Sequence, residues 1–504
     1  MKVLSLSGFL IVLWVSTAWG QDSLLQAQDQ LQRRGEVVFA FEVPDGGTLS
    51  RLSREVSIDQ VSGLHVVAYA NQMEFETFLA HGLAYQVLAP ASEGPAPVGM
   101  HEKGVWNFDT YPTYDEYVKM MAKFQADYPD LCEIVDVGAT VQGRRLLFAR
   151  ISDRIKDREA EPRVMLLASM HGDETTGYVI LLRLIDHLLS SYGAEPGIRA
   201  LVDRTEIWIL PLSNPDGTFY GGNGSVKGAT RYNAGWVDLN RDYPEINQGD
   251  TELDLTSLDS SRFAPETYAL MRLASQFHFT LGATFHGGAE VINYPWDSWT
   301  SDEIQHADHS WWQAIAHRFA DSVQRDSAGA HMTGFDDGIT HGGDWYVIHG
   351  GHQDFMTYYN HSREMTVEIS DTKLLPAGQL TSFWTYSKNA LLQFIGAALT
   401  GVSGTVLAEG SGEPLPARIE IAGHDHTNSH VHAELPLGDY YRYLSPGSYD
   451  VTFGSPGYLS QTHRVTVSLE GDTRLDVALV PVLQERGAPL FDLSRGGYEG
   501  TRIR

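Results

Sequence analysis

The feature that most constrains this chain is an apolar run that ends abruptly in a histidine and carboxylates. Residues 164–170 read Val-Met-Leu-Leu-Ala-Ser-Met, and His171-Gly-Asp-Glu174 follows at once. Such a run is typical of a buried strand, and in open α/β sheets ligands bind at the carboxyl ends of strands. His171 and Glu174 are therefore candidate ligands of a Zn²⁺ ion, which at a catalytic site needs a third protein ligand and an open position for water. Alone, the pattern is more typical of a polar loop, so its interpretation depends on the rest of the chain.

Length and composition indicate a folded protein of several domains. The chain has 504 residues, of which 42% are hydrophobic and 11% aromatic, which is typical of globular proteins. We expect a signal peptide over residues 1–20, an N-terminal α+β domain over 21–98 and a catalytic domain over 99–400. A β-sandwich over 401–482 and a tail over 483–504 complete the prediction.

The N-terminus predicts export. Residues 1–20 carry one lysine, then an apolar stretch, then Ala18 and Gly20 around a small-residue cleavage pattern, so Gln21 is the expected mature start. No other apolar run is long enough to span a bilayer. We therefore expect a soluble protein that is secreted or periplasmic. Cys132 is the only cysteine, which excludes an intramolecular disulfide and indicates a packed thiol.

Charge excludes one class of partner. The formal net charge of −28 argues against nucleic acid or an anionic membrane surface as a partner. The simplest interpretation of this charge is solubility.

The alternation of elements predicts the fold class. Between residues 99 and 400, apolar strand candidates (164–170, 206–212, 281–285 and 365–370) alternate with helical stretches, which indicates a mixed central sheet flanked by helices. In the N-terminal unit, strands are expected over 37–43, 64–70 and 85–88, and helices over 48–57 and 73–81. After Gly401 the pattern changes to short alternating runs separated by Pro-Gly turns, which predicts an all-β sandwich.

Further polar motifs accompany strand candidates of the α/β segment. Asn214-Pro-Asp-Gly217 follows one strand and is a turn by its chemistry. A motif over residues 231–244 contains Arg231 and an Asn-Arg pair. His286 follows the strand candidate 281–285, and Glu368 lies inside the apolar strand candidate 365–370, where a carboxylate is costly unless it is paired or functional.

Together these motifs resemble the zinc metallocarboxypeptidases of the carboxypeptidase A/B type. The sequence is closest to the regulatory branch that includes carboxypeptidases N, E, M and D. The motifs His171-x-x-Glu174, Arg231, Asn240-Arg241, His286-Gly-Gly and Thr366-Val-Glu-Ile-Ser370 all occur in the family's order. The resemblance covers roughly residues 105–400, and residues 438–452 look like the transthyretin-like module of that branch.

The resemblance implies a set of catalytic roles. His171, Glu174 and His286 would hold one Zn²⁺ ion per chain, leaving an open coordination position. Glu368 would be the general base that takes a proton from water and delivers it to the leaving amine. Arg231 would stabilise the oxyanion.

It also implies how substrate is held. Asn240 and Arg241 would bind the terminal carboxylate, since a guanidinium suits a planar anion. Asp238 would accept a hydrogen bond from His171 and so set the tautomer of its ring. In isolation each of these residues, Arg231 and His286 included, is equally compatible with an ordinary structural role.

Specificity follows from two positions in the same way. Asp297 stands eleven residues after His286, and Gln353 stands in the motif Gly350-Gly-His-Gln-Asp354; in the regulatory branch these positions help to bind a basic terminal side chain. A polar loop is the alternative. The family's mobile tyrosine usually lies three residues after this aspartate, but here Thr357 stands at that place, and Tyr358 is a shifted candidate.

We therefore expect an exported zinc exopeptidase that acts on peptide or protein C-termini and releases Lys or Arg. One alternative is a zinc amidohydrolase of the same fold acting on cell-wall peptides or side-chain amides. A second is a catalytically inactive binding protein. The unit over residues 21–98 is equally compatible with a removable inhibitory propeptide and a permanent accessory domain, and the sequence does not indicate an oligomeric state.

Overall fold

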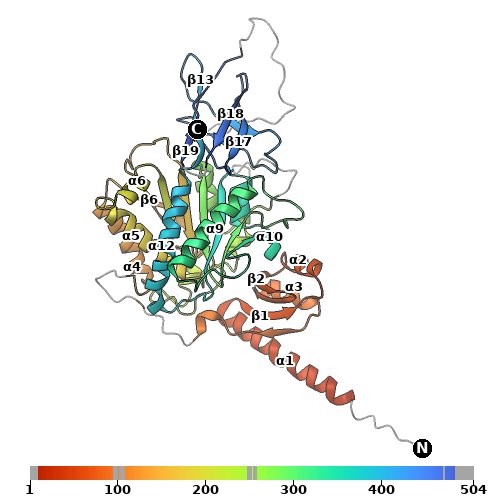
Figure 1. Ribbon diagram of the computed structural model, residues 1–504. Helices are drawn as coiled ribbons and strands as arrows, with labels where there is room; N and C mark the ends of the chain where they lie inside the picture. Colours follow the sequence, from red (N-terminus) through yellow and green to blue (C-terminus); the bar gives the residue numbers. More distant parts are fainter. Residues whose placement is uncertain are drawn as a thin grey trace, which may run out of the picture.

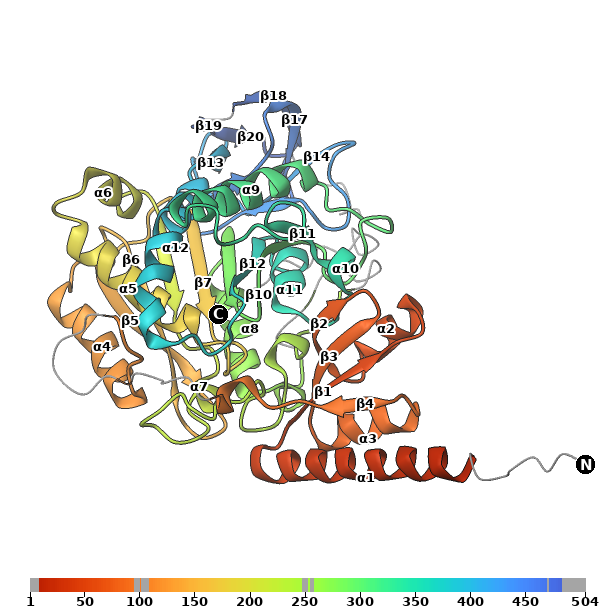
Figure 2. The same ribbon diagram turned by 60° about the horizontal axis from the view of Figure 1, so that its bottom comes forward.

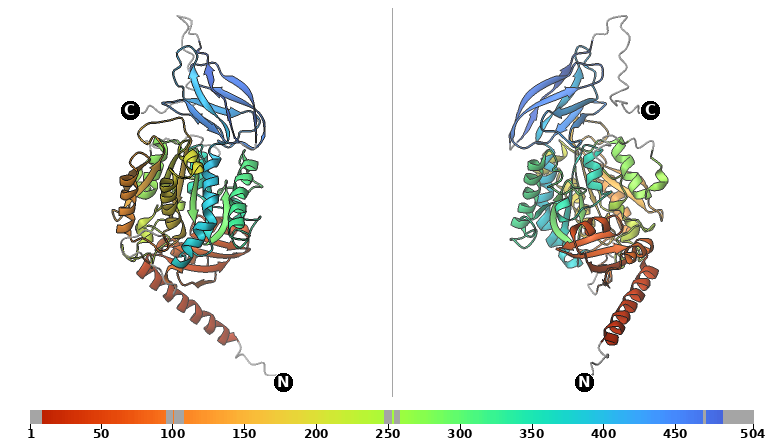
Figure 3. Two further views of the ribbon diagram at one scale, coloured as in Figure 1. Left: turned by 60° about the vertical axis from the view of Figure 1, so that its left-hand side comes forward. Right: turned by 90° about the vertical axis from the view of Figure 1, so that its right-hand side faces the viewer.

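The computed structural model describes residues 9–94, 100, 108–246, 253, 258–468 and 471–482, with side chains from residue 22 onward. The described chain forms a central α/β part, an N-terminal part at one end of it and a C-terminal β part at the other (Figures 1 and 3). The prediction of a mixed α/β sheet with separate β sheets at the C-terminus is confirmed. The predicted tail over 483–504 lies outside the described residues, as do residues 1–8 of the predicted signal peptide.

The N-terminal part is a four-stranded antiparallel sheet with helices packed against it. The strand order is β2-β3-β1-β4, and Phe39, Phe41, Phe75 and Phe78 form the centre of its core. Its elements are α1 (Phe9–Arg34), β1 (Val37–Glu42), α2 (Gly46–Leu52), β2 (Ser57–Ser62), β3 (His65–Ala70), α3 (Gln72–Ala80), β4 (Tyr85–Val87) and η1 (Ala91–Glu93).

Two expectations for this part need correction. The helix expected over residues 48–57 ends at Leu52, and the strand β2 that follows was not predicted. The Asp45 side chain caps the start of the helix by accepting from the backbone N–H of Thr48, and no apolar stripe continues beyond Leu52. The expected linker over residues 90–97 also begins as packed structure, since Ser92 is buried and its hydroxyl donates to the carbonyl of Ala229 at 2.7 Å.

The central part is built on an eight-stranded mixed sheet of order β11-β10-β12-β9-β7-β8-β6-β5. The inner strands β12, β9, β7 and β8 are mutually parallel, while β10, β6 and β5 run antiparallel to their inner neighbours. The strands are β5 (Cys132–Ala139), β6 (Arg145–Ile151), β7 (Arg163–Ala168), β8 (Glu206–Leu210), β9 (Leu281–His286), β10 (Ala289–Tyr294), β11 (Ile339–His341) and β12 (Arg363–Ser370).

Helices cover both faces of this sheet (Figure 2). The large core on one face includes side chains of α4, α5, α6, α9 and α12, and the core on the other includes side chains of α8 and α11. The helices are α4 (Tyr114–Asp127), α5 (Thr176–Ser191), α6 (Pro196–Val202), α7 (Pro215–Thr218), η2 (Leu239–Arg241), η3 (Ser260–Arg262), α8 (Pro265–Gln276), α9 (His309–Asp326), α10 (Gly342–Trp345), α11 (His352–Tyr358), η4 (Ala377–Gln379) and α12 (Leu380–Ala397).

The C-terminal part consists of two small sheets around an apolar core of its own. One sheet has the order β16-β13-β19, with β20 also paired to β13, and the other has the order β15-β14-β17-β18. Its strands are β13 (Gly401–Ala408), β14 (Ala417–Ile421), β15 (Val431–Ala433), β16 (Asp439–Arg442), β17 (Gly447–Gly454), β18 (Gln461–Val467), β19 (Asp472–Arg474) and β20 (Val477–Leu479).

Cys132 is buried at the start of β5, and burial raises the pKa of its thiol to about 12. This agrees with the expectation of a packed thiol. Among the described helices, none has both the length and the apolar character needed to cross a membrane.

Candidate active site

Three adjacent parallel strands bring the predicted metal ligands and the predicted base to one edge of the sheet. His286 is the last residue of β9, and the strand pairing places it opposite Glu368 on β12. His171 follows the end of β7, the neighbour of β9 on its other side. Because parallel strands end at the same edge, residues far apart in sequence meet there.

The side chains of His171, Glu174 and His286 converge on one point. Nδ1 of His171 lies 3.0 Å from Oε1 of Glu174, Nδ1 of His286 lies 2.8 Å from its Oε2, and the two Nδ1 atoms are 3.1 Å apart. All three residues are only 3% exposed. The Nε2 of His171 donates to Oδ1 of Asp238 at 3.0 Å, which leaves Nδ1 as the nitrogen with the lone pair. Two imidazole nitrogens and a carboxylate are the donor types that zinc prefers, so this set fits the ion.

Although burial and Arg231 oppose it, the carboxylates of Glu174 and Asp238 raise the pKa of His171, so a metal ion would compete with a proton for this ring. The protonation of the other two ligands already suits a metal. Burial lowers the pKa of His286 to about 4, so its ring is neutral at pH 7. Burial alone favours a neutral Glu174, but the neighbouring His171, Lys373 and His286 hold the pKa of its carboxyl well below the usual range. A neutral imidazole and an ionised carboxylate are the forms that bind a cation.

Glu368 is partly buried beside these residues, and one of its carboxylate oxygens is inaccessible to solvent and unengaged. Its Oε2 has no hydrogen-bond partner among the described residues. Burial, together with the charge of Glu174, raises the pKa of Glu368 well above its usual range. A carboxylate that holds a proton more tightly than usual is suited to take one from water.

Arg231 lies between the His171–Glu174–His286 set and the N-terminal part of the chain. Its Nε donates to Oδ2 of Asp238 at 3.1 Å, and its Nη1 lies 3.4 Å from Oε1 of Glu174. The side chain is 2% exposed. A buried guanidinium next to the candidate zinc ligands can stabilise negative charge that develops on a reacting carbonyl oxygen.

Asn240 and Arg241 approach the same cavity from the short helix η2. The Asp238 side chain caps this helix by accepting from the backbone N–H of Asn240 at 2.8 Å. Oδ1 of Asn240 accepts from the backbone N–H of His352 at 2.9 Å, and Nη2 of Arg241 donates to the carbonyl of Ile58 at 3.0 Å. Both side chains line the cavity.

Asp297 lies at another side of this cavity and is 2% exposed. Its Oδ1 accepts from Nδ2 of Asn293 at 3.0 Å, and Asn293 in turn accepts from Nε2 of Gln353 at 3.4 Å. Burial, and then the charge of the neighbouring Asp354, raises the pKa of Asp297 to about 8. Gln353 is buried behind Asn293 and is not among the lining residues.

Glycine is required where the chain passes Asp297. A Cβ atom added at Gly342 would lie 1.9 Å from Oδ1 of Asp297 and 2.6 Å from Oδ1 of Asn293. The backbone at Gly342 therefore packs directly against the side chains of Asp297 and Asn293, which line the cavity.

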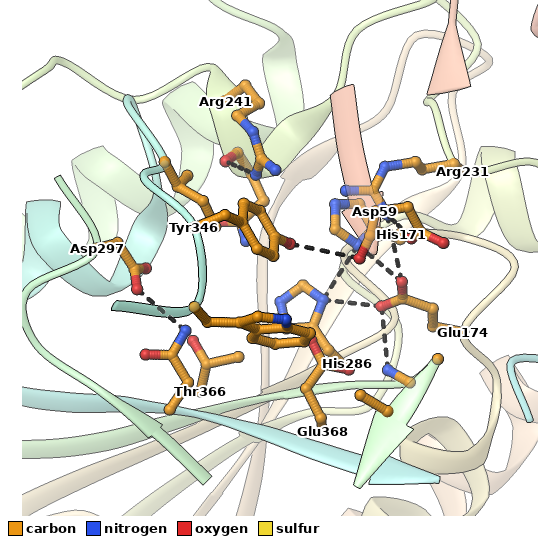
Figure 4. A pocket seen from close by; sticks show the side chains of 17 residues that line it. Asp59, His171, Glu174, Arg231, Arg241, His286, Asp297, Tyr346, Thr366 and Glu368 are labelled. Atoms are coloured by element: carbon orange, nitrogen blue, oxygen red, sulfur yellow. Dashed lines mark hydrogen bonds and ion pairs between the residues drawn. The ribbon is translucent and has the colours of Figure 1, made fainter. Parts of the chain in front are cut away.

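The prediction for Tyr358 needs correction. Tyr358 is 1% exposed, packs against Trp296 and Trp299, and is not among the residues that line the cavity. Tyr346 lines it instead, and in the view of Figure 4 its ring lies between Asp297 and Asp59. In the family pattern the tyrosine lies after Asp354, whereas Tyr346 lies before the motif over residues 350–354.

The N-terminal part also contributes to the site, which sequence reasoning missed. Strand β2 pairs with β3 through an irregularity between Ile58 and Gln60, so Asp59 stands outside the regular register. A bulge of this kind can re-aim a side chain, and here Oδ1 of Asp59 lies 2.9 Å from Nη1 of Arg231 (Figure 4). The Ser57 hydroxyl contacts both Asp238 and Arg231.

Lys373 is a second residue that the motifs did not identify. Its Nζ lies 2.6 Å from Oδ1 of Asp59 and 3.1 Å from Oε1 of Glu174, and it sits over the ring of Tyr69 at 4.8 Å. It follows the motif that ends at Ser370 by three residues, which is the one signal that could have indicated it.

Little space remains between these side chains. The cavity among them has a volume of about 20 Å³. This is enough for a single water molecule and far too small for a terminal amino acid. With β2 in this position, a peptide C-terminus has no room beside Arg231 and Arg241.

A mixed α/β sheet with a buried His-Glu-His set and a partly buried glutamate at its edge defines the class of zinc metallopeptidases. Comparison with known sequences identifies the family, because the profile described as zinc carboxypeptidase matches residues 117–390. The chain therefore belongs to the zinc carboxypeptidase family and is a zinc metallocarboxypeptidase.

Curated relatives agree with this assignment. Carboxypeptidase SOL1 of Arabidopsis thaliana is 34% identical over 81% of this chain and 79% of its own length. The carboxypeptidase N catalytic chain of Homo sapiens is 33% identical over 70% of this chain and 82% of its own length. Human carboxypeptidase D is 32% identical over 71% of this chain, which spans only 26% of that longer protein.

Solved structures share the fold at lower identity. Carboxypeptidase A from Helicoverpa armigera has a TM-score of 0.52 at 19% identity, over 72% of this chain and 98% of that one. Thrombin-activatable fibrinolysis inhibitor has a TM-score of 0.51 at 16% identity over the same shares.

Proposed function

We propose that this enzyme removes a C-terminal Lys or Arg from peptides or proteins, using the site formed by His171, Glu174, His286 and Glu368. The observation that carries the proposal is a single cavity lined by candidate zinc ligands, two arginines and a buried aspartate. The arginines match a terminal carboxylate and the aspartate matches a basic side chain. These are the two features that distinguish a C-terminal basic residue from other peptide groups.

The proposed reaction assigns a task to each side chain. When bound, zinc supplies Lewis-acid chemistry that polarises a carbonyl and activates water at neutral pH. Glu368 takes the proton of the attacking water and gives it to the amine that leaves when the C–N bond breaks. Arg231 stabilises the negative charge on the former carbonyl oxygen.

Substrate binding is assigned to the other side of the cavity. Arg241 and Asn240 hold the terminal carboxylate and so restrict cleavage to the last peptide bond. Asp297 pairs with the basic side chain, and Asn293 and Gln353 support it from behind. In the uncut chain Arg241 donates instead to Ile58, so the groups that substrate requires are engaged by β2.

This engagement supports the propeptide interpretation of the N-terminal part. Asp59 pairs with Arg231 and Lys373, and the carbonyl of Ile58 accepts from Arg241. A permanent accessory domain has no need to fill the cavity. We infer that the part before residue 95 inhibits the enzyme and that cleavage between residues 95 and 107 permits its release.

The proposal also includes export and a transthyretin-like module. The charge, apolar run and small residues of positions 1–20 support a signal peptide, and the paired β sheets after residue 400 support the module. The structure has a continuous helix from Phe9 to Arg34, which includes the expected cleavage point. N-terminal sequencing of protein recovered outside the producing cells should begin at Gln21, and a start at Met1 would contradict this part.

The test of the function is release of the terminal residue from matched blocked dipeptides that end in Arg, Lys, Phe, Glu or Ala. Each is assayed with and without a zinc chelator, on the uncut chain and on protein cut between residues 95 and 107. We expect chelator-sensitive release of Arg and Lys, with a large gain on cutting. Release of Phe or Ala instead would contradict the role of Asp297, and no release from the zinc-loaded cut enzyme would contradict the exopeptidase function and favour an amidohydrolase or a binding protein.

A further inference from the structure

Three histidines far from the active site pack against one another where the central and C-terminal parts meet. The ring centroids of His361 and His430 are 4.2 Å apart, those of His361 and His432 are 4.7 Å apart, and those of His430 and His432 are 4.8 Å apart. One ring nitrogen from each residue lies within 4.8 Å of the others. His430 is buried and the other two are partly buried.

Two separate segments build this cluster. His361 lies in the loop between α11 and β12 of the central part, whereas His432 is the middle residue of β15 in the C-terminal part. His430 is two residues before His432, and in an extended chain such residues point to the same side. The cluster therefore depends on the contact between the two parts.

The hydrogen bonds leave ring nitrogens available inside the cluster. Nδ1 of His361 donates to the carbonyl of Asn428 at 3.1 Å, so its Nε2 carries the lone pair. Metal-bound histidines generally donate their other ring N–H in this way. The Nε2 atoms of His430 and His432 are only 3.0 Å apart, so both rings direct a nitrogen into the same small space.

No carboxylate balances the three rings. Among the residues that the structure describes, this group consists of the three imidazoles alone, without an aspartate or glutamate. Hydrogen bonds among three imidazoles in contact cannot engage all of their ring nitrogens. The cluster therefore has no evident role in stabilising the fold by itself. A divalent cation would satisfy three nitrogen lone pairs at once.

We propose that His361, His430 and His432 bind a divalent transition-metal ion of the zinc type, which links the C-terminal sheets to the catalytic part. Three imidazoles suit zinc, copper, nickel or cobalt better than calcium or magnesium, which prefer oxygen ligands. Three protein ligands leave a further position for water. The ion would bridge a loop of one part and a strand of the other.

The site is separate from the catalytic zinc site. His361 precedes β12 and Glu368 lies near the end of that strand, seven positions later. The strand from Arg363 to Glu368 spans roughly 17 Å, so the two sites lie toward opposite ends of β12. The ion has a structural role in this proposal and takes no part in hydrolysis.

One neighbouring cation must move when the metal binds. Nη1 of Arg418 lies 3.3 Å from Nε2 of His430. The Arg418 side chain is 39% exposed and its Nε pairs with Glu420 at 2.8 Å, so it can turn toward solvent without leaving a buried charge unpaired. Binding then exchanges the hydrogen bonds that Nε2 of His430 makes with Arg418 and with His432 for metal–nitrogen bonds.

The first test counts metal ions on the full chain. The protein is dialysed against a buffered micromolar concentration of Zn²⁺, and bound zinc is measured by mass spectrometry of the metal. We expect two zinc ions per chain, one at each site. One zinc ion per wild-type chain would overturn the proposal whatever any variant does.

Variants assign the second ion. We expect His430→Gln with His432→Gln to bind one zinc ion, and His171→Gln with Glu174→Gln to lose the other one only. His463→Gln is the matched control, because this partly buried histidine of the C-terminal part bonds to Gln461 and lies outside the cluster; it should keep both ions.

His361→Gln tests the same site from the catalytic part, in case the double variant does not fold. It should also bind one ion. When the proteins are loaded with Co²⁺ in place of Zn²⁺, this variant should lack the visible absorption that the second cobalt ion gives in the wild type. If the wild-type chain binds two ions and neither His361→Gln nor the double variant loses one, the second ion lies elsewhere and the proposal is wrong.

Discussion

The carboxylate of Asp59 lies 2.9 Å from Nη1 of Arg231, and both side chains are almost completely buried. One residue belongs to a small N-terminal sheet and the other to the catalytic site, so this ion pair joins two parts that the chain separates by more than 170 positions. The same carboxylate lies 2.6 Å from Nζ of Lys373. In the proposed mechanism, this contact occupies the charge that Arg231 would offer to a reacting carbonyl.

Removing this carboxylate should activate the uncut chain. Asp59→Ala removes one carboxylate from a network in which Arg231 keeps Asp238 and Glu174 and Lys373 keeps Glu174. The cost should therefore be smaller than the loss of about 3–5 kcal/mol that follows when a buried charge loses its sole partner. That cost weakens the closed arrangement, so the uncut variant should release C-terminal Arg at least about tenfold faster than the uncut wild type.

The control for this experiment is Glu76→Gln, a change on α3 of the same part, where the exposed Glu76 side chain accepts a hydrogen bond from Gln72. It should leave the rate of the uncut chain unchanged. Equal activities of uncut wild type, uncut Asp59→Ala and cut enzyme would show that the N-terminal part does not inhibit.

Replacing Glu368 should remove turnover while leaving the metal in place. Glu368→Gln keeps the size of the side chain but cannot accept a proton, so kcat should fall by about 10²–10⁴. KM should change little, because Glu368 is not assigned to binding substrate in the ground state. Zinc content, measured in parallel, should equal that of the wild type, and a variant that keeps full kcat would remove Glu368 from the mechanism.

The catalytic edge of the sheet could be predicted because its signals are local. An apolar run followed by His171, a second run ending at His286 and a carboxylate within a third run each indicate a strand end or strand position from neighbouring residues alone. Pairing of β7, β9 and β12 then brings them together. The same apolar runs that predict the strands of the sheet therefore also predict that these side chains meet at one end of it.

The closing contact could not be predicted because it depends on how two separate parts dock. Asp59 lies in a six-residue strand with a weak alternating pattern, and a predicted helix ended just before it. Tyr346 belongs to a loop between motifs and carries no periodic signal. The histidine cluster has the same origin, since His361 meets His430 only when the C-terminal sheets are in place.

Specificity for a basic residue should depend on pH through Asp297. The pKa of this buried carboxyl is about 8, so at pH 6 most of the empty enzyme carries a neutral Asp297. A basic side chain needs the charged form, so below pH 8 the KM for a C-terminal Arg substrate should rise by up to about tenfold per pH unit. Dividing this KM by the KM for a matched substrate that ends in Ala cancels the pH effects of other groups, because those effects act on both substrates.

Asp297→Asn should abolish this slope. The variant should bind the Arg substrate more weakly at pH 9, and its Arg-to-Ala ratio of KM values should not vary between pH 6 and 9.

Stability provides a second measurement. The folded state holds a proton on Asp297 up to about pH 8, whereas the unfolded state releases it near pH 4. This group therefore makes the free energy of unfolding fall as pH rises between those values. A wild-type ratio that is independent of pH would contradict the assignment.

The junction between the central and C-terminal parts should depend strongly on Asp308. Its Oδ2 accepts from Nη2 of Arg363 at 2.7 Å and from Nη1 of Arg442 at 2.6 Å, and all three side chains are buried. Among the described residues, Asp308→Asn leaves the buried Arg363 without its ion-pair partner, while the buried Arg442 keeps Asp425, so the free energy of unfolding should fall by about 3–5 kcal/mol. Urea unfolding followed by circular dichroism measures this loss.

A surface pair supplies the comparison for that experiment. Asp450 and Arg464 form an exposed ion pair on β17 and β18, so Asp450→Asn should cost less than about 1 kcal/mol.

Stability at low pH adds an independent check on Asp308. Although burial opposes ionisation, Arg442 and Arg363 hold the pKa of Asp308 well below its usual range. Its contribution is therefore complete above the pKa of an ordinary carboxyl and is lost only as pH falls below it. Wild-type stability should thus fall more steeply than that of Asp308→Asn between pH 4 and pH 2, and equal losses for the two variants at pH 7 would show that the buried network does not hold the junction.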